Sequence, residues 1–212
     1  MRTLLLVTLL SAATATAAAA APAETTETLL LRGHAQTLHL YDTRGGTPVI
    51  VSSGDGGWIH LGPHVAEALA RHGFFVIGFD AKAYLSSFTT NHSTLRPDDE
   101  PGDYKVLADF AAGGGRRRPI LVGVSEGAGL SVLAATDPAT RAAIGGVVCL
   151  GLPDINEFGW RWKDAIIYVT PGAFAPARQT ALRVADRSCW PLRCACWRSP
   201  SRLAAPSRYG EP

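Results

Sequence analysis

Several features are absent from this sequence of 212 residues, and each absence narrows the class of protein. No histidine follows His92, so the cysteines near the C-terminus have no histidine beside them with which to complete a zinc site. Beyond the first segment, no apolar run reaches the roughly 18 residues that a membrane-spanning helix needs. No glycine-rich stretch ends in Gly-Lys-Ser or Gly-Lys-Thr, which disfavours a nucleotide phosphate loop. The sequence therefore indicates neither a metal nor a cofactor.

The first 23 residues have the layout of a secretory signal peptide. Arg2 precedes an apolar core over residues 4–10, and the alanine-rich stretch that follows offers several A-x-A cleavage sites. A buried N-terminal helix is the alternative, but the segment has no amphipathic period. We therefore expect a Sec-type signal and a periplasmic or secreted protein.

Charge and cysteine content change near residue 171. Through Pro171 the chain carries 13 basic and 16 acidic residues, whereas residues 172–212 carry seven Arg, no Lys and two acids. Cys149 lies in an apolar run and is expected to be a buried thiol, but the other three cysteines cluster in residues 189–196. We interpret residues 24–171 as one α/β core and residues 172–212 as an aberrant or disordered tail without a strand-like run.

The core alternates between strand and helix patterns, which predicts an α/β fold with a mostly parallel sheet and helices on both faces. Residues 27–33 and 36–42 are expected to pair as an edge hairpin, and residues 81–103 to form a loop above the sheet. Further strands are predicted at 47–53, 74–80, 120–124, 145–152 and 165–170, and helices at 63–71, 104–112 and 127–137.

The segment "ILVGVSEGAG" (120–129) has the pattern of a nucleophile elbow, in which a strand delivers a serine into a tight turn before a helix. Gly123 and Gly127 would leave space where larger side chains collide, and Ser125 would point to the carboxyl edge of the sheet. The N–H of Glu126 would face the same point from the helix N-terminus and stabilise an oxyanion. The alternative is a glycine-rich turn with Ser125 as a helix N-cap.

A second glycine-rich loop, "SSGDGGW" (52–58), follows the strand at 47–53. In the fold expected here, this loop supplies the other oxyanion donor, and we assign that role to the N–H of Asp55. The Asp55 side chain is as well suited to capping the turn as to any catalytic role.

These two loops together resemble the α/β-hydrolase superfamily. More narrowly, "SSGDGGW", "GFDAKAYL" and the Gly-x-Ser-x-Gly elbow resemble bacterial virulence proteins of the VirJ and AcvB type, over about residues 48–170. The resemblance implies a periplasmic serine hydrolase, with activity on aminoacylated phosphatidylglycerol in the AcvB branch and general esterase activity in related proteins. Glu126 in "EGAG" departs from the family pattern and implies a different substrate.

The acid and base that a serine hydrolase needs are not both evident. Such enzymes place them after the serine in the order Asp or Glu, then His, yet all six histidines precede Ser125. Asp154 occupies one position that the fold uses for the acid, with a turn aspartate as the alternative. His60, beside the glycine-rich loop, is the candidate substitute base.

The tail offers an explanation for the missing histidine. Its composition is typical of a frameshifted reading frame, so we expect a hydrolase that is incomplete at its C-terminus. The arginines of the tail could instead form an arm that binds anionic lipid or nucleic acid. This alternative is disfavoured because exported proteins rarely meet nucleic acid.

The sequence as a whole predicts an exported serine hydrolase with impaired activity on a small-molecule or lipid-borne ester. A lipid ester would imply peripheral contact with a membrane, and no nucleic acid partner is expected. A non-catalytic periplasmic binding or virulence accessory protein is the alternative. The sequence indicates no oligomeric state.

Overall fold

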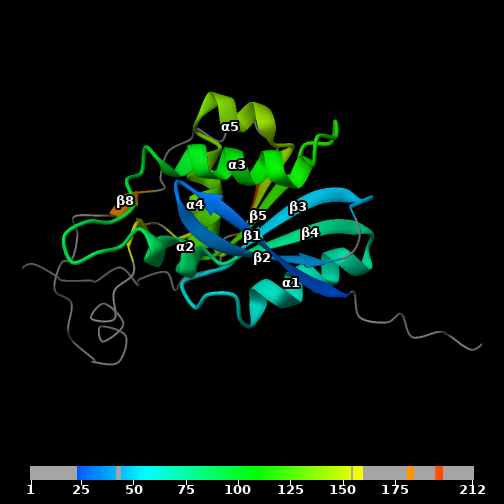
Figure 1. The fold of residues 1–212 in the computed structure, drawn as a ribbon, viewed down its shortest axis with the longest axis horizontal. Coiled ribbons are helices and arrows are strands. Elements are labelled where there is room, and N and C mark those ends of the chain that lie inside the picture. Colours follow the sequence, from blue (N-terminus) through cyan, green and yellow to red (C-terminus); the bar gives the residue numbers. More distant parts are fainter. Residues whose placement is uncertain (1–22, 42–43, 154, 160–180, 184–193, 198–212) are drawn as a thin grey trace, which may run out of the picture.

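In the described part of the chain, one sheet of seven strands joins an antiparallel hairpin to a block of parallel strands (Figure 1). The computed structural model describes residues 23–41, 44–153, 155–159, 181–183 and 194–197. The strands are β1 (Glu24–Leu31), β2 (His34–Tyr41), β3 (Thr47–Ser52), β4 (Phe74–Phe79), β5 (Ile120–Val124), β6 (Gly146–Leu150), β7 (Ile155–Glu157), β8 (Ala181–Arg183) and β9 (Cys194–Trp197). The helices are α1 (Leu61–Arg71), α2 (Ala81–Ser87), α3 (Glu100–Ala112), α4 (Glu126–Ala134) and α5 (Pro138–Ala143).

The strand order is β1-β2-β4-β3-β5-β6-β9, and β7 and β8 form a separate pair. β3 lies between β4 and β5 and is parallel to both, while β6 is parallel to β5 and β9. The predicted edge hairpin is confirmed, since β1 and β2 pair antiparallel along their whole length. Because parallel strands end at one edge, the loops after β3, β4, β5 and β6 meet there.

The two faces of the sheet bury different sets of apolar side chains. Along β3, Ile50 faces one cluster and Val49 and Val51 face the other, as the two-residue period of a strand requires. Helices α2, α3 and α4 contribute to the larger cluster, and α1 packs Ala66 and Ala70 into the smaller one. Helices therefore cover both faces, and the predicted α/β architecture is confirmed.

Cys149 is fully buried in β6, as its apolar surroundings predicted. Within the described residues, no helix combines the length and the apolar character needed to cross a membrane. The predicted signal segment and the predicted strand at 165–170 lie outside the described residues, apart from Ala23.

Two predictions about the elements were wrong. The segment 81–103, expected to be a loop, contains α2, because Asp80 accepts a hydrogen bond from the N–H of Ala83 at 3.0 Å and caps the helix. The region after residue 171, expected to have no strand, contributes β8 and β9, and β9 extends the parallel sheet beside β6. A four-residue strand at the edge of a sheet is specified by its pairing partner more than by its own apolar pattern.

Candidate active site

The elbow at Ser125 is a strained turn between β5 and α4. Ser125 has a φ of 50° and a ψ of −116°, a conformation that residues other than glycine rarely adopt. Its N–H donates to the carbonyl of Leu150 at 2.8 Å, and its own carbonyl accepts from the N–H of Ala128 at 2.8 Å. These bonds hold the turn between β6 and the first turn of α4.

The Ser125 side chain does not cap α4. An N-cap serine has an extended backbone and accepts a hydrogen bond from an amide of the first turn, but Ser125 has a positive φ and makes no such bond. The hydroxyl is partly exposed and has no hydrogen-bond partner among the described residues. This geometry differs from the capping alternative and agrees with an elbow that presents its hydroxyl.

The glycines of the elbow are required by close backbone packing. A Cβ at position 123 would collide with Ala128 and the carbonyl of Gly127, and a Cβ at position 127 would collide with the carbonyls of Ser52 and Ser53. The elbow is therefore pressed against both the start of α4 and the end of β3, which the Gly-x-Ser-x-Gly spacing permits.

The glycine-rich loop after β3 lies directly beside the serine. A Cβ placed on Gly54 would be 3.2 Å from Cβ and 3.9 Å from Oγ of Ser125, so glycine leaves an opening at that point. The loop is closed by a hydrogen bond from the N–H of Gly57 to the carbonyl of Gly54 at 3.0 Å. Asp55 is exposed at the tip of this loop, and Glu126 is buried at the first position of α4.

Hydrogen bonds inside the protein fix the base of this loop. Ser52 Oγ and the Tyr104 hydroxyl lie 2.9 Å apart in the core, and the N–H of Ala81 donates to Ser53 Oγ at 3.0 Å. Ser131 Oγ donates to the carbonyl of Gly127 at 2.7 Å. These residues position the two loops, and the sequence reasoning missed them because no motif links Tyr104 to the end of β3.

Trp58 anchors the other end of the loop. Its ring lies against Gly78 in β4, where any Cβ would collide with it, and stacks on His39 with ring centroids 5.1 Å apart. A glycine inside the buried strand "FFVIGF" is the signal that could have revealed this contact, because such glycines often mark a close approach.

The described residues do not include a base that is hydrogen-bonded to Ser125. None of the six histidines, all of which lie in the described residues, is hydrogen-bonded to its hydroxyl. His39 pairs with Glu24 at 2.7 Å, and His60 is exposed at the start of α1 with a φ of 55° and a ψ of −110°. His60 thus repeats the backbone conformation of Ser125. Asp154, the candidate acid, lies outside the described residues.

A second polar cluster lies buried beneath the same edge of the sheet. Glu100 is fully buried without a hydrogen-bond partner among the described residues, and burial together with the nearby Asp103 raises its pKa well above the usual value. Asp103 accepts from the Tyr84 hydroxyl at 2.6 Å and from Arg32 Nη2 at 2.7 Å. Among the described residues no group of three His, Cys, Asp or Glu side chains is arranged to hold a metal ion.

The chain is similar to a known bacterial protein family. A family model described as bacterial virulence protein (VirJ) matches residues 47–164, which is more than half of the chain. No curated protein matches the sequence.

A solved hydrolase structure shares the fold. A putative dienelactone hydrolase from Klebsiella pneumoniae superposes with a TM-score of 0.50 at 16% identity, covering 66% of this chain and 65% of that one. A hypothetical protein from Pseudomonas aeruginosa has a TM-score of 0.48 at 22% identity, covering 64% and 44%. The chain therefore spans less than two thirds of either structure's length. The expected α/β-hydrolase fold is confirmed.

Proposed function

Because the chain belongs to the VirJ family of bacterial virulence proteins, we propose that it is a serine hydrolase with Ser125 as its nucleophile. The observation that carries this proposal is the backbone of Ser125, which is strained, held by hydrogen bonds on both sides, and leaves the hydroxyl without a structural partner among the described residues. Strain of this kind gathers at functional sites.

The proposed reaction is acyl transfer to water. Ser125 Oγ bonds to the carbonyl carbon of an ester, the hydroxyl proton passes to a base, and the C–O bond to the leaving alcohol breaks as the alcohol takes up a proton. Water then cleaves the acyl-serine and releases the acid. The N–H groups of Asp55 and Glu126 would stabilise the oxyanion, a role supported by the contact of Gly54 with Ser125 and by the position of Glu126 at the start of α4.

We also propose the acid and the base of the site. Asp154 is the candidate acid and His60 the candidate substitute base; the strained backbone of His60 supports a functional role for it. We expect slow turnover, because oxyanion stabilisation and binding alone still leave about 10³–10⁴-fold catalysis over water when a triad member is missing.

We further propose that the protein is exported through its first 23 residues and acts in the periplasm. The substrate would be a small-molecule ester, or a lipid-borne one such as aminoacyl-phosphatidylglycerol, which would bring the protein to the membrane surface. The alternative is a binding or virulence accessory protein that uses the same fold without catalysis. None of the histidines is hydrogen-bonded to Ser125, which favours this alternative.

A fluorophosphonate probe distinguishes the two functions. We expect the folded wild-type chain to be labelled and the Ser125→Ala variant not to be labelled, with Ser93→Ala, an exposed serine in another loop, as the matched control. Labelling that is equal in wild type and Ser125→Ala would exclude Ser125 as the nucleophile. Reduced labelling in His60→Ala would support His60 as the base.

A further inference from the structure

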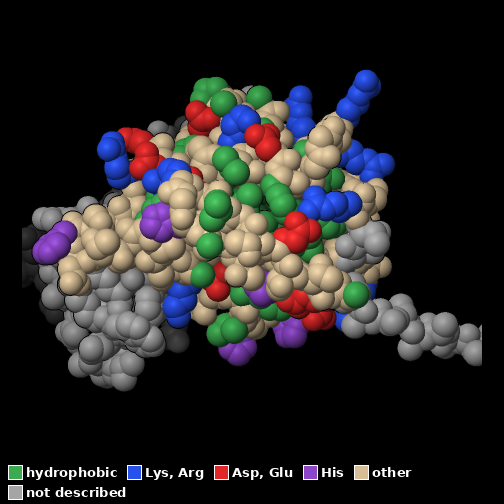
Figure 2. Space-filling view, viewed as in Figure 1, with side chains coloured by type: hydrophobic (Ala, Val, Ile, Leu, Met, Phe, Trp, Pro, Cys, Tyr) green, Lys and Arg blue, Asp and Glu red, His purple; other side chains and the backbone are tan. Residues whose placement is uncertain are grey.

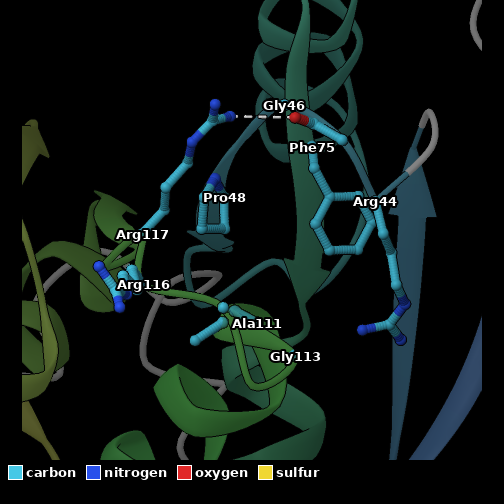
Figure 3. A pocket seen from close by; sticks show the side chains of 11 residues that line it. Arg44, Gly46, Pro48, Phe75, Ala111, Gly113, Arg116 and Arg117 are labelled. Atoms are coloured by element: carbon cyan, nitrogen blue, oxygen red, sulfur yellow. Dashed lines mark hydrogen bonds between the residues drawn. The ribbon is translucent and has the colours of Figure 1, made fainter.

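A pocket with a volume of about 370 Å³ opens at the amino edge of the sheet, opposite the edge that carries Ser125 (Figure 3). Its walls come from the segment before β3, the start of β4 and the loop that follows α3. Pro48, Phe75 and Ala111 supply apolar surface, and Figure 3 shows the Phe75 ring beside the cavity. The volume lies within the usual range of small-molecule sites.

Three arginines surround this pocket. In Figure 3, Arg116 and Arg117 lie on one side of it and Arg44 lies on the other, and Figure 2 shows blue side chains gathered over the loop that follows α3. Within the described residues, Glu27 is the only carboxylate that forms an ion pair with any of the three, through Arg44 Nη2 at 3.1 Å. The rim therefore has a surplus of two positive charges.

Two of these arginines are held in place by the protein. Arg117 Nη1 donates to the carbonyl of Gly45 at 3.0 Å, and the Arg44 guanidinium lies over Phe75 and Phe110, with ring centroids 5.3 and 4.9 Å away. Each guanidinium has five N–H donors, so these contacts leave donors for a ligand. Arg116 is exposed and has no ion pair or hydrogen bond among the described residues, so its donors are open to a ligand.

We propose that this pocket binds a phosphate ester, independently of the reaction at Ser125. A phosphate dianion matches the surplus of two positive charges, and its oxygens accept paired hydrogen bonds from guanidinium groups. The carbon part of the ester would pack on Phe75, Pro48 and Ala111, which an inorganic ion would leave uncovered.

The ester could be free in solution or be the headgroup of an anionic lipid. The parallel strands separate the pocket from Ser125 by about 16 Å, the length of a five-residue strand. If Ser125 acts on a lipid-borne ester, as proposed above, a headgroup bound here would turn the Ser125 edge away from the membrane that carries the substrate. The free ester is therefore the favoured source.

Isothermal titration of the full-length chain with phenyl phosphate tests the proposal. We expect binding that the Arg116→Gln variant weakens about tenfold, as expected for the loss of one charged hydrogen bond. Arg96→Gln removes an equal charge at a side chain that is 75% exposed in another loop, and it should leave the affinity unchanged. Phenol should not bind, and inorganic phosphate should bind more weakly than phenyl phosphate.

Vesicles of phosphatidylcholine with and without phosphatidic acid form the second arm. If the protein binds the anionic vesicles but not phenyl phosphate, and Arg116→Gln but not Arg96→Gln abolishes this binding, the phosphate belongs to a lipid. The proposal is overturned if neither phenyl phosphate nor the anionic vesicles bind, or if Arg116→Gln binds as well as wild type. Equal thermal unfolding midpoints of the two variants without ligand would show that folding is not the cause of a loss.

Discussion

Glu100 and Asp103 lie one turn apart on α3 and are both buried, but they differ in their hydrogen-bond partners. Asp103 receives hydrogen bonds from Tyr84 and Arg32, which compensate for its loss of water. Glu100 is fully buried and has no such partner in the part of the chain that the structure describes, so its burial and the charge of Asp103 raise its pKa well above 4.5. Glu100 therefore stays protonated over a pH range in which an unfolded chain would ionise it.

This difference predicts a pH dependence of stability. A carboxyl group with a raised folded-state pKa contributes its full stability below the unfolded pKa of 4.5, and this stability is lost as pH rises toward the folded-state pKa. We expect Glu100→Gln to be nearly neutral at pH 4 and increasingly stabilising above it, by up to about 1.4 kcal/mol per pH unit. Urea unfolding at several pH values measures this effect.

Glu67→Gln is the control for this variant, because Glu67 is on the surface of α1 and pairs with Arg71 at 3.1 Å. Its effect should stay within about 0.5 kcal/mol and should not grow with pH. A Glu100→Gln variant whose stability relative to wild type is the same at pH 4 and pH 7.5 would show that Glu100 is ionised in the folded protein.

At the scale of elements, the Asp103 carboxylate links three parts of the fold. It joins Arg32, in the turn between β1 and β2, to Tyr84 of α2 and to its own helix α3. The Arg32 side chain is 38% exposed, so water screens its share of the interaction, whereas Asp103 is only 4% exposed. The buried hydrogen bond from Tyr84 therefore contributes much of the stabilisation that Asp103 provides.

We expect Asp103→Ala to lower the free energy of unfolding by about 2 kcal/mol, because it leaves the Tyr84 hydroxyl buried without an acceptor. Asp109→Ala on the same helix removes an exposed pair with Lys105 and should cost no more than about 0.5 kcal/mol. Denaturant unfolding of both variants makes the comparison. Equal losses in the two variants would indicate that the buried link does not determine the cost.

The elements differ in how far the sequence predicts them. β5 begins and ends where its apolar run does, and the hairpin β1–β2 is clear from its turn at residues 32–33. The elbow is also predictable, because a Cβ at position 123 or 127 would collide with neighbouring backbone atoms and Gly123 and Gly127 avoid this collision. By contrast, α2 depends on the Asp80 cap and on packing of Tyr84 and Leu85 into the core, which a polar segment does not reveal.

The support of the site depends on contacts between distant parts of the chain. Tyr104 reaches Ser52 across 52 positions, and Trp58 fills the space over Gly78. Such pairs have no local pattern, so single-sequence reasoning finds the two loops and misses the residues that hold them.

At the scale of the whole molecule, the parallel sheet does not end at β6. β9 pairs with β6 from Val147 to Leu150, and the backbone groups of β6 on that side therefore have partners. A strand edge without a partner promotes association between chains. The C-terminal region thus contributes to the fold even though its composition differs from that of the core.

We therefore expect a chain ending at Pro171, which lacks β8 and β9, to unfold at lower urea concentration and to associate. A chain ending at Trp197 keeps both strands and is the matched control, and it should have the unfolding midpoint and the oligomeric state of the full-length chain. Urea titration and size-exclusion chromatography with light scattering measure the two properties. If the chain ending at Pro171 is monomeric and as stable as the control, pairing with β9 contributes nothing to the stability of the sheet. If only the chain ending at Pro171 has a lower urea midpoint and associates, the stabilisation comes from residues 172–197, in which β9 extends the parallel sheet.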